Sequence, residues 1–152
     1  TRISHVWMMA RLPMYLVDTN VISEIRKRDR ADKGVMAFCR KASRDDADLY
    51  LSVVTIGEIR RGVELIRHRG DKPQATRLEN WLDDVLLEFG PHVLAVDEEI
   101  GQLWGRLRVP HPEHALDKLI AATALIHDLT VVTRNVDDFA GTGNRVLNPF
   151  DA

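Results

Sequence analysis

The sequence predicts an α/β fold in which helices cover a parallel β-sheet of four to five strands. Short, continuous apolar runs alternate along the chain with longer segments that have helical periodicity. Runs without polar alternation suit strands that are covered on both faces, as in parallel sheets. The 152 residues match the size of one domain. We therefore expect a single sheet with helices packed against it.

Four apolar runs predict the strands, and a weaker fifth run follows them. The expected strands are residues 14–17, 49–53, 93–96 and 129–133, with 145–147 as the weak fifth. Asp18 follows the first strand and Asp97 follows the third. Because ligand sites of open parallel sheets form outside the carboxyl ends of the strands, these ends are the places to look for functional residues.

The segments between the strands predict helices. The expected helices are residues 20–27, 31–42, 55–68, 76–89, 98–107 and 115–127. The third of them is the clearest, because Ile56, Ile59, Val63 and Ile66 form one apolar stripe. A Gly-Asp-Lys-Pro segment at 70–73 is expected to break the chain between the third and fourth helices.

Composition excludes several classes of protein. The formal net charge of −2 excludes a strongly basic nucleic-acid coat, but it leaves binding through local patches or a bound metal open. The single cysteine, Cys39, excludes an internal disulfide and a cysteine-based zinc site. No apolar run reaches about 18 residues, so we expect no membrane segment. Residues 1–13 are interpreted as a tag or an extension upstream of a start at Met14. The domain then spans residues 14–152, and its expected location is the cytoplasm, with Cys39 reduced.

Four acidic residues lie near the carboxyl ends of the predicted strands: Asp18, Glu58, Asp117 and Asp138. Each one has an ordinary structural explanation. Thr55 and Glu58 have the spacing of a capping box, and Asp18 suits a helix N-cap. Asp117 can complement a helix dipole, and Asp138 is a common type of turn residue. Taken singly, the structural and functional interpretations stay equally open.

Taken together, the acids favour a metal site. Clustered carboxylates repel one another unless a cation holds them. Carboxylates without clustered Cys or His favour Mg²⁺, with Mn²⁺ as a substitute. His111 and His114 have H-x-x-H spacing close to Asp117. Because Pro112 disfavours a helix that would aim both rings together, we interpret them as loop histidines rather than ligands.

Four motifs in order then resemble PIN-domain ribonucleases, especially the VapC-type toxins of bacterial toxin–antitoxin pairs. The first is YLVDTNVISE, and the second is SVVTIGEIRRG. The third is LDKLIAATA, and the fourth is VVTRNVDDF, followed by a VLNPF tail. They cover residues 15–24, 52–62, 116–124, 131–139 and 146–150. DTN alone is a weak signal, but four ordered motifs that each lie near a strand end are a specific one.

The resemblance implies a three-layer α/β/α fold with the first strand in the centre of the sheet, between the second and the fourth. It implies that the metal-binding catalytic acids are Asp18, Glu58, Asp117 and Asp138, with Asp137 left as an alternative for the fourth. It further implies polar residues that orient the acids and the metal-bound water: Thr19, Asn20, Thr133 and Asn135. The segment between Trp104 and Asp117 departs from the family pattern, because it is short and carries Pro110 and Pro112.

The same resemblance implies a Mg²⁺-dependent endoribonuclease toxin with a cognate antitoxin and a homodimeric assembly. Chemistry supports a water nucleophile activated by one or two metal ions, with no covalent intermediate. A negative cleft needs cations on its rim to hold the RNA backbone. The candidates for that role lie near the first two motifs: Arg26, Lys27, Arg28, Arg60 and Arg61. Alternatively, these residues lie on solvent-exposed helix faces and have no role in binding.

Two other functions compete with this one. A signalling receiver domain is also a parallel α/β fold with acids at strand ends, and Asp97 and Thr133 offer a possible phospho-acceptor and threonine. However, a receiver needs paired acids after the first strand and a lysine before the final proline, where this chain has Asp18 and Asn148. A catalytically silent PIN scaffold that only binds a partner is the second alternative, and the presence of all four acids argues against it.

Overall fold

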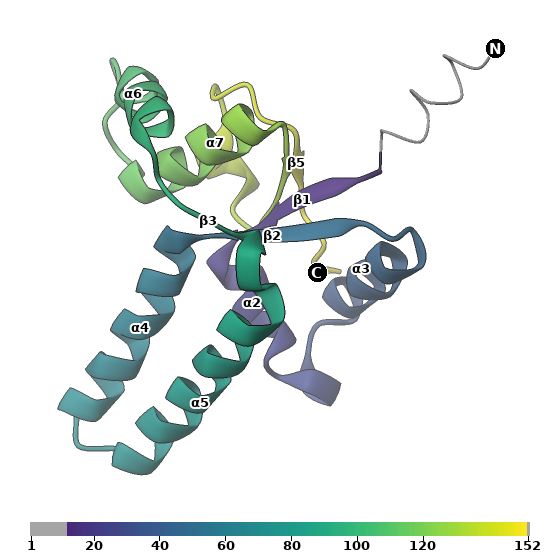
Figure 1. The fold of residues 1–152 in the computed structure, drawn as a ribbon, viewed down its shortest axis with the longest axis vertical. Helices are drawn as coiled ribbons and strands as arrows, with labels where there is room; N and C mark the ends of the chain where they lie inside the picture. Colours follow the sequence, from purple (N-terminus) through teal and green to yellow (C-terminus); the bar gives the residue numbers. More distant parts are fainter. Residues whose placement is uncertain (1–11, 152) are drawn as a thin grey trace.

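The structure is a computed structural model that describes residues 12–151, and its centre is a five-stranded parallel sheet (Figure 1). The strands are β1 Met14–Val17, β2 Asp48–Ser52, β3 Val93–Leu94, β4 Thr130–Val132 and β5 Val146–Leu147. Their order across the sheet is β3-β2-β1-β4-β5, and all neighbours are parallel. The predicted parallel sheet with a central first strand is therefore confirmed.

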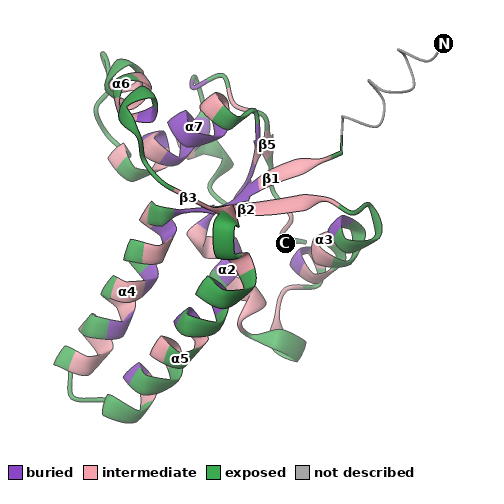
Figure 2. Ribbon diagram, viewed as in Figure 1, coloured by how far each residue is buried: buried purple, intermediate pink, exposed green. Residues whose placement is uncertain are grey.

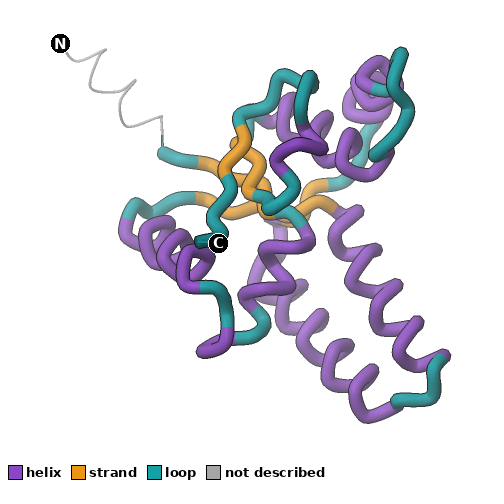
Figure 3. The backbone as a smooth tube through the Cα atoms, turned by 180° about the vertical axis from the view of Figure 1, so that it is seen from behind, coloured by secondary structure: helices purple, strands orange, loops and turns teal. Residues whose placement is uncertain are grey.

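Helices cover both faces of the sheet, which gives the expected three layers (Figure 1). They are α2 Thr19–Ile25, α3 Lys33–Arg44, α4 Val53–His68, α5 Lys72–Phe89, α6 Glu98–Leu107 and α7 Ala115–His127. Helices α6 and α7 lie on one side of the sheet, and α2 to α5 lie on the other. Figure 3, seen from behind, shows the α4–α5 hairpin extending away from the strands.

Successive residues of the central strand supply two separate cores. Leu16 packs with Ile120 and Phe139 on the α7 side, while Val17 packs with Ile59 and other residues on the α4 side. This alternation follows from the two-residue period of a strand. Leu16 and Val17 are both buried and Met14 and Tyr15 are of intermediate exposure (Figure 2), so the strand is apolar until the chain leaves the sheet at Asp18.

The start of α4 differs from the prediction. The helix begins at Val53 and not at Thr55, since the Ser52 hydroxyl accepts a hydrogen bond from the Val54 amide at 3.0 Å and caps the helix. Strand β2 accordingly ends at Ser52. The predicted capping box between Thr55 and Glu58 is therefore wrong, because both residues lie inside the helix.

The predicted third strand is also too long. Strand β3 pairs only with Leu51 and Ser52 of β2, and β2 ends there. Residues after Leu94 consequently have no neighbouring strand, and Val96 is exposed. Asp97 then caps α6, with its carboxylate accepting from the Ile100 amide at 2.9 Å.

Acidic side chains cap the starts of three other helices, and the predicted N-cap role of Asp18 is confirmed. Asp32 caps α3 and Asp71 caps α5, so α5 begins at Lys72 and includes Pro73 in its first turn. Asp18 caps α2, which ends at Ile25 and not at Lys27. The predicted break between α4 and α5 is present but shorter than 70–73, because a proline in the first helical turn costs no hydrogen bond.

The chain's last described residues lie against the start of α3. The Asp151 amide donates to the Asp32 carboxylate at 3.0 Å. Gly34 permits this approach, because a Cβ there would collide with the Pro149 carbonyl oxygen. The tag or extension predicted at residues 1–13 falls almost wholly outside the described residues. No helix within the described part of the chain has the length and hydropathy needed to cross a membrane.

Candidate active site

A cleft of about 310 Å³ opens at the carboxyl end of the central strand. Three of the four predicted acids line it, namely Asp18 from the end of β1, Glu58 from α4 and Asp117 from the first turn of α7. The other lining residues are Thr19, Asn20, Ser23, Val54, Leu116, Ile120 and Asn135. Segments far apart in sequence meet here because β1 lies between β2 and β4 in the sheet.

Asp18 is buried and held by hydrogen bonds on both oxygens. Its Oδ1 accepts from the Thr19 amide at 2.8 Å, and its Oδ2 accepts from the Thr133 hydroxyl at 2.8 Å. Asn20 Nδ2 lies 3.4 Å from the same Oδ2. Burial raises the pKa of Asp18, the hydrogen bonds from Thr133 and Thr19 oppose that shift, and nearby Asp138 adds to it. The carboxylate is thus fixed in place at an unfavourable site for a charge.

Asn20 and Asn135 connect the first and fourth motifs. Asn20 donates to the Thr133 hydroxyl at 3.2 Å, and its Oδ1 accepts from the Arg134 amide at 3.0 Å. The Asn135 backbone N–H also donates to the Thr133 hydroxyl, at 3.0 Å. These bonds tie the loop after β4 to the start of α2 and orient Asp18 between them.

Glu58 is exposed on the cleft side of α4. A hydrogen bond of 3.2 Å between the hydroxyls of Thr19 and buried Thr55 fixes α4 against α2. Because Glu58 follows Thr55 by three residues, the two lie on the same face of the helix. This contact directs the Glu58 side chain toward the carboxyl end of β1, with no capping role to explain its presence.

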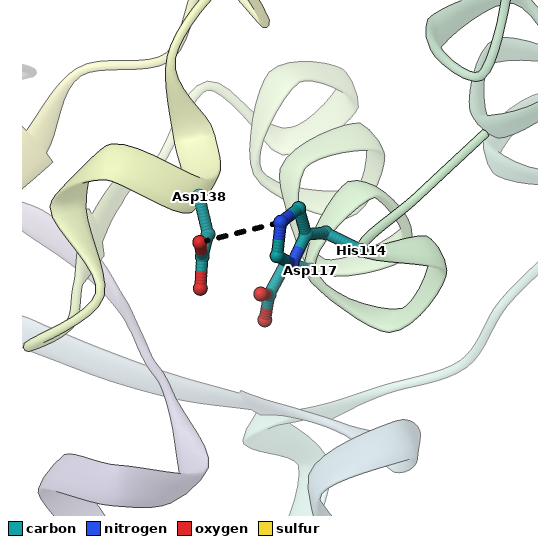
Figure 4. Close-up of side chains that lie close together, drawn as sticks. All are labelled: His114, Asp117 and Asp138. Carbon is teal, nitrogen blue, oxygen red and sulfur yellow. Dashed lines mark ion pairs between the residues drawn. The ribbon is translucent and has the colours of Figure 1, made fainter. Parts of the chain in front are cut away.

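Asp117 and Asp138 lie close together on the other side of the cleft, together with His114 (Figure 4). His114 Nε2 is 3.7 Å from Asp138 Oδ1. Burial, the charges of Asp18 and Asp138 and a hydrogen bond with Asp138 raise the pKa of Asp117 to about 6, and His114 opposes the shift. A carboxyl group perturbed in this way, in a cleft, is typical of a functional site.

The donor set fits a divalent metal ion. One ligand atom each from His114, Asp117 and Asp138 lies within 4.8 Å of the others. Asp18 adds a carboxylate near enough to raise the pKa of Asp117. Carboxylate oxygens are the ligands of hard divalent cations, and a cation removes the repulsion between the acids. Glu58 lines the same cleft but does not belong to the closest group.

The structure distinguishes the two neighbouring aspartates of the fourth motif. The Asp138 carboxylate is half-buried and faces His114, whereas Asp137 is exposed and does not belong to the group of possible ligands among the described residues. Asp138 is therefore the member of the pair that reaches the acidic cluster. Its backbone position follows from a short helical turn over Val136–Phe139.

The sequence did not identify three residues as members of this site, namely Ser23, Thr55 and His114. Ser23 lies one turn after Asn20 on α2, and this spacing was a usable signal. Thr55 was assigned to a cap and instead joins α4 to α2. His111 and His114 do lie in a loop, as predicted, and His111 faces Glu113 at 3.5 Å. Only His114 reaches the acids, through a left-handed backbone conformation that no sequence pattern indicated.

The predicted rim cations differ in their availability. Arg60 is paired with Glu79 at 2.5 Å and with Glu64 at 3.4 Å, which ties α4 to α5. Lys27 is paired with Glu24 at 2.9 Å. Among the described residues, no ion pair within 4.0 Å engages the other three candidates, Arg26, Arg28 and Arg61.

The arrangement does not suit the receiver alternative. Asp97 caps α6 and lines a separate hollow with Glu98 and Arg106. Thr133 is buried and donates to Asp18. Two strands, β2 and β1, separate β3 from β4, so Asp97 and Thr133 do not belong to one site.

Comparison with known proteins agrees with this geometry. The family model described as "PIN domain" matches residues 15–144. Toxin FitB of Neisseria gonorrhoeae is 34% identical over 142 residues, which cover 90% of this chain and 99% of that protein. VapC ribonuclease Y4jK of Sinorhizobium fredii is 30% identical over 144 residues, which cover 91% of this chain and 99% of that protein. The crystal structure of FitAcB from Neisseria gonorrhoeae superposes with a TM-score of 0.76 at 34% identity and covers 90% of this chain and 98% of that chain.

The match spans all four motifs and every strand of the sheet except β5. The residues that carry the resemblance are those that the fold brings to one cleft. The chain therefore belongs to the PIN domain family.

Proposed function

We propose that this chain is the toxin of a two-component toxin–antitoxin pair and that it acts as a Mg²⁺-dependent endoribonuclease. One observation carries the proposal: Asp18, Glu58 and Asp117, from three separate motifs, line a single cleft. The relatives support it, since two of them are named as a toxin and as a ribonuclease. Its place of action is the cytoplasm, where RNA and Mg²⁺ are available.

The roles of the residues follow from their positions. Asp18, Glu58, Asp117 and Asp138 supply oxygen ligands, and Mn²⁺ can replace Mg²⁺ with this donor set. Thr133 and Asn20 donate to the Asp18 carboxylate, and the Asn135 backbone N–H donates to the Thr133 hydroxyl. A bound divalent ion would lower the pKa of a water ligand and neutralise charge on the phosphate oxygens. Because clustered carboxylates suit a divalent ion that activates a water ligand, we assign the nucleophile to water.

The partners follow from the same family. The solved relatives include FitAB bound to a DNA fragment, at 32% identity and a TM-score of 0.74. By analogy, we propose that a cognate antitoxin blocks the cleft of this chain and that the active form is a homodimer. RNA is the substrate, and Arg26, Arg28 and Arg61 are proposed to hold its backbone, since no ion pair among the described residues engages them.

The proposal is tested with the purified chain and a mixture of cellular RNAs. We expect endonucleolytic cleavage that requires Mg²⁺ or Mn²⁺, is lost with EDTA, and is abolished by Asp18→Asn. Asparagine keeps the size of the side chain but removes the charge. Mapping the RNA ends produced in cells after induction without the antitoxin then identifies the target.

A silent scaffold predicts a different result. Its Asp18→Asn variant binds a partner as well as the wild type does, and the purified wild-type chain shows no metal-dependent cleavage. If circular dichroism shows that the protein is folded, that result would refute the enzymatic function and favour the scaffold.

A further inference from the structure

His114 stands apart from the other histidines of the described residues because its ring faces two acids of the cleft (Figure 4). Its Nε2 lies 3.7 Å from Asp138 Oδ1, which is too long for a direct hydrogen bond. A small gap thus separates the imidazole from the Asp138 carboxylate, whereas the two carboxylates share a hydrogen bond. The side chain is half exposed, so solvent and ions reach this gap.

The loop before α7 fixes His114 in this position. His114 has a left-handed backbone and immediately precedes Ala115, the first residue of α7. The buried Lys118 ammonium donates to the His111 carbonyl, and Trp104 Nε1 donates to the Ala115 carbonyl at 2.8 Å. These contacts anchor the loop on both sides of His114. They place the ring beside the first turn of α7, where Asp117 lies.

The spacing of the three donor groups suits coordination of one ion. Two ligands about 2.1 Å from a metal lie about 3 Å apart when they are adjacent and about 4.2 Å apart when they are opposite. The His114–Asp138 distance falls between these values, and all three donor atoms lie within 4.8 Å of one another. A small contraction therefore brings the group to coordination distances.

We propose that His114 is a nitrogen ligand of the catalytic metal, together with Asp117 and Asp138, and that it biases this site toward Mn²⁺ over Mg²⁺. Imidazole is a good ligand for transition metals, whereas Mg²⁺ favours oxygen ligands and keeps several waters. Carboxylates and water suit both Mg²⁺ and Mn²⁺, and one added imidazole favours the transition metal. The inference rests on the proposed function, because it assigns a further residue to the same metal site.

The test measures metal binding directly on protein without a polyhistidine tag. Pulsed electron paramagnetic resonance of the Mn²⁺-loaded chain is expected to show a directly coordinated ¹⁴N. His114→Asn and His114→Gly both tolerate the left-handed backbone and both remove the ring. Each is expected to lose the nitrogen signal and at least about tenfold in Mn²⁺ affinity by calorimetry, with about a twofold or smaller change in Mg²⁺ affinity.

His111→Asn is the matched control, because His111 lies in the same loop but faces Glu113. It is expected to keep the signal and the wild-type affinity for Mn²⁺. A wild-type spectrum without coordinated nitrogen, or unchanged Mn²⁺ affinity in both His114 variants, overturns the inference. If the wild-type chain still cleaves RNA with Mg²⁺ in that case, the proposed function stands and only the role of His114 fails.

Discussion

The Thr133 hydroxyl donates its single proton to Oδ2 of Asp18 across 2.8 Å. Its oxygen also accepts from Asn20 Nδ2 and from the Asn135 amide, at 3.2 and 3.0 Å. A hydroxyl has one proton and two lone pairs, so all its hydrogen-bonding capacity is used. Oδ2 of Asp18 must consequently be an acceptor. The fourth motif thus fixes the orientation of an acid that belongs to the first.

Replacing this hydroxyl is expected to impair stability and activity together. Thr133→Val leaves the Asn20 amide and the Asn135 N–H without their shared acceptor, which costs about 1–3 kcal/mol in the free energy of unfolding. It also frees Asp18, and we expect RNA cleavage to fall about 10- to 100-fold. Urea denaturation and a cleavage assay measure the two effects. Thr133→Ser keeps the hydroxyl and is expected to stay close to wild type, whereas equal activity in both variants would contradict the orienting role.

Glu58 and Ser52 are expected to separate activity from stability. Ser52 caps α4 and Glu58 does not, so Ser52→Ala should lower the free energy of unfolding by about 1 kcal/mol. Glu58→Gln should leave stability unchanged and lower cleavage by at least about 100-fold through loss of a ligand charge. Thermal denaturation and cleavage assays on both variants provide the comparison. Preserved cleavage in Glu58→Gln would remove Glu58 from the metal site.

The raised pKa of Asp117 predicts how stability depends on pH when metal is removed. The pKa rises from 3.8 to about 6 on folding. Between these values the native state binds more protons than the unfolded state, so stability in EDTA falls as pH increases from about 4 to above 6. Because Asp117 is partly exposed and its charge is screened, the loss attributable to it is about 1 kcal/mol. Urea denaturation at pH 5 and pH 7.5 measures the difference in the free energy of unfolding. Asp117→Asn is expected to lack the part of this difference that Asp117 contributes.

Divalent metal is expected to reverse the same loss. Binding to the native state alone stabilises by mass action, so Mg²⁺ or Mn²⁺ should raise the melting temperature of the wild type at pH 7.5. Asp117→Asn should reduce this response while leaving the domain folded. An identical Mg²⁺ response in Asp18→Ala, Glu58→Ala and the wild type would show that these acids do not share an ion.

Arg60 and Arg61 are adjacent, but we expect only Arg61 to contribute to RNA binding. Arg60 is engaged by Glu79 and Glu64, whereas Arg61 is exposed and lies one turn after Glu58 on α4. Arg61→Gln should weaken RNA binding. It should also reduce the magnitude of the slope of log K against log salt concentration by about 1, as expected for one lost phosphate contact. Arg60→Gln should instead affect stability. Filter binding at several salt concentrations, with catalytically inactive Asp18→Asn as background, tests the difference.

Sequence reasoning predicted the sheet, its helices and the position of three acids near strand ends, because these depend on local patterns. Leu16 and Val17 are apolar since both faces of β1 are buried, and the motif residues follow strand ends that the fold brings together. It failed where the outcome depends on tertiary contacts. Ser52 and Thr55 are equally good caps by type, and only the end of β2 decides between them. The length of β3 likewise depends on where its neighbour ends.

His114 shows the same limit at the site. Its spacing from Asp117 was visible, but its direction depends on a left-handed turn and on the Lys118 and Trp104 contacts that hold the loop. The pair Asp137 and Asp138 was also ambiguous by sequence, because either position fits the motif. The helical turn at Val136–Phe139 turns one carboxylate to the cluster and the other to solvent.

The last prediction concerns how an antitoxin blocks this cleft. Asp18, Glu58 and Asp117 present uncompensated negative charge there, and a guanidinium makes paired hydrogen bonds to carboxylates. We expect an arginine of the antitoxin to occupy the cleft and to compete with Mg²⁺. A separate amphipathic segment of the antitoxin would use the apolar side chains that α5 leaves exposed, Leu86 and Leu87, since Leu82 and Val85 are already buried.

Titration of the purified complex with Mg²⁺ tests this competition. Increasing Mg²⁺ should release the antitoxin or weaken its apparent affinity, and a larger Mg²⁺ excess should be needed as antitoxin concentration rises. Asp18→Asn and Asp117→Asn should lower the affinity for the antitoxin, since each removes a charge that the arginine contacts. Leu87→Ser is the matched test of the apolar contact, because Leu87 is 83% exposed and its replacement leaves the core intact. If an antitoxin whose basic residues are replaced still inhibits fully, and the acid variants bind it like wild type, the arginine does not occupy the cleft.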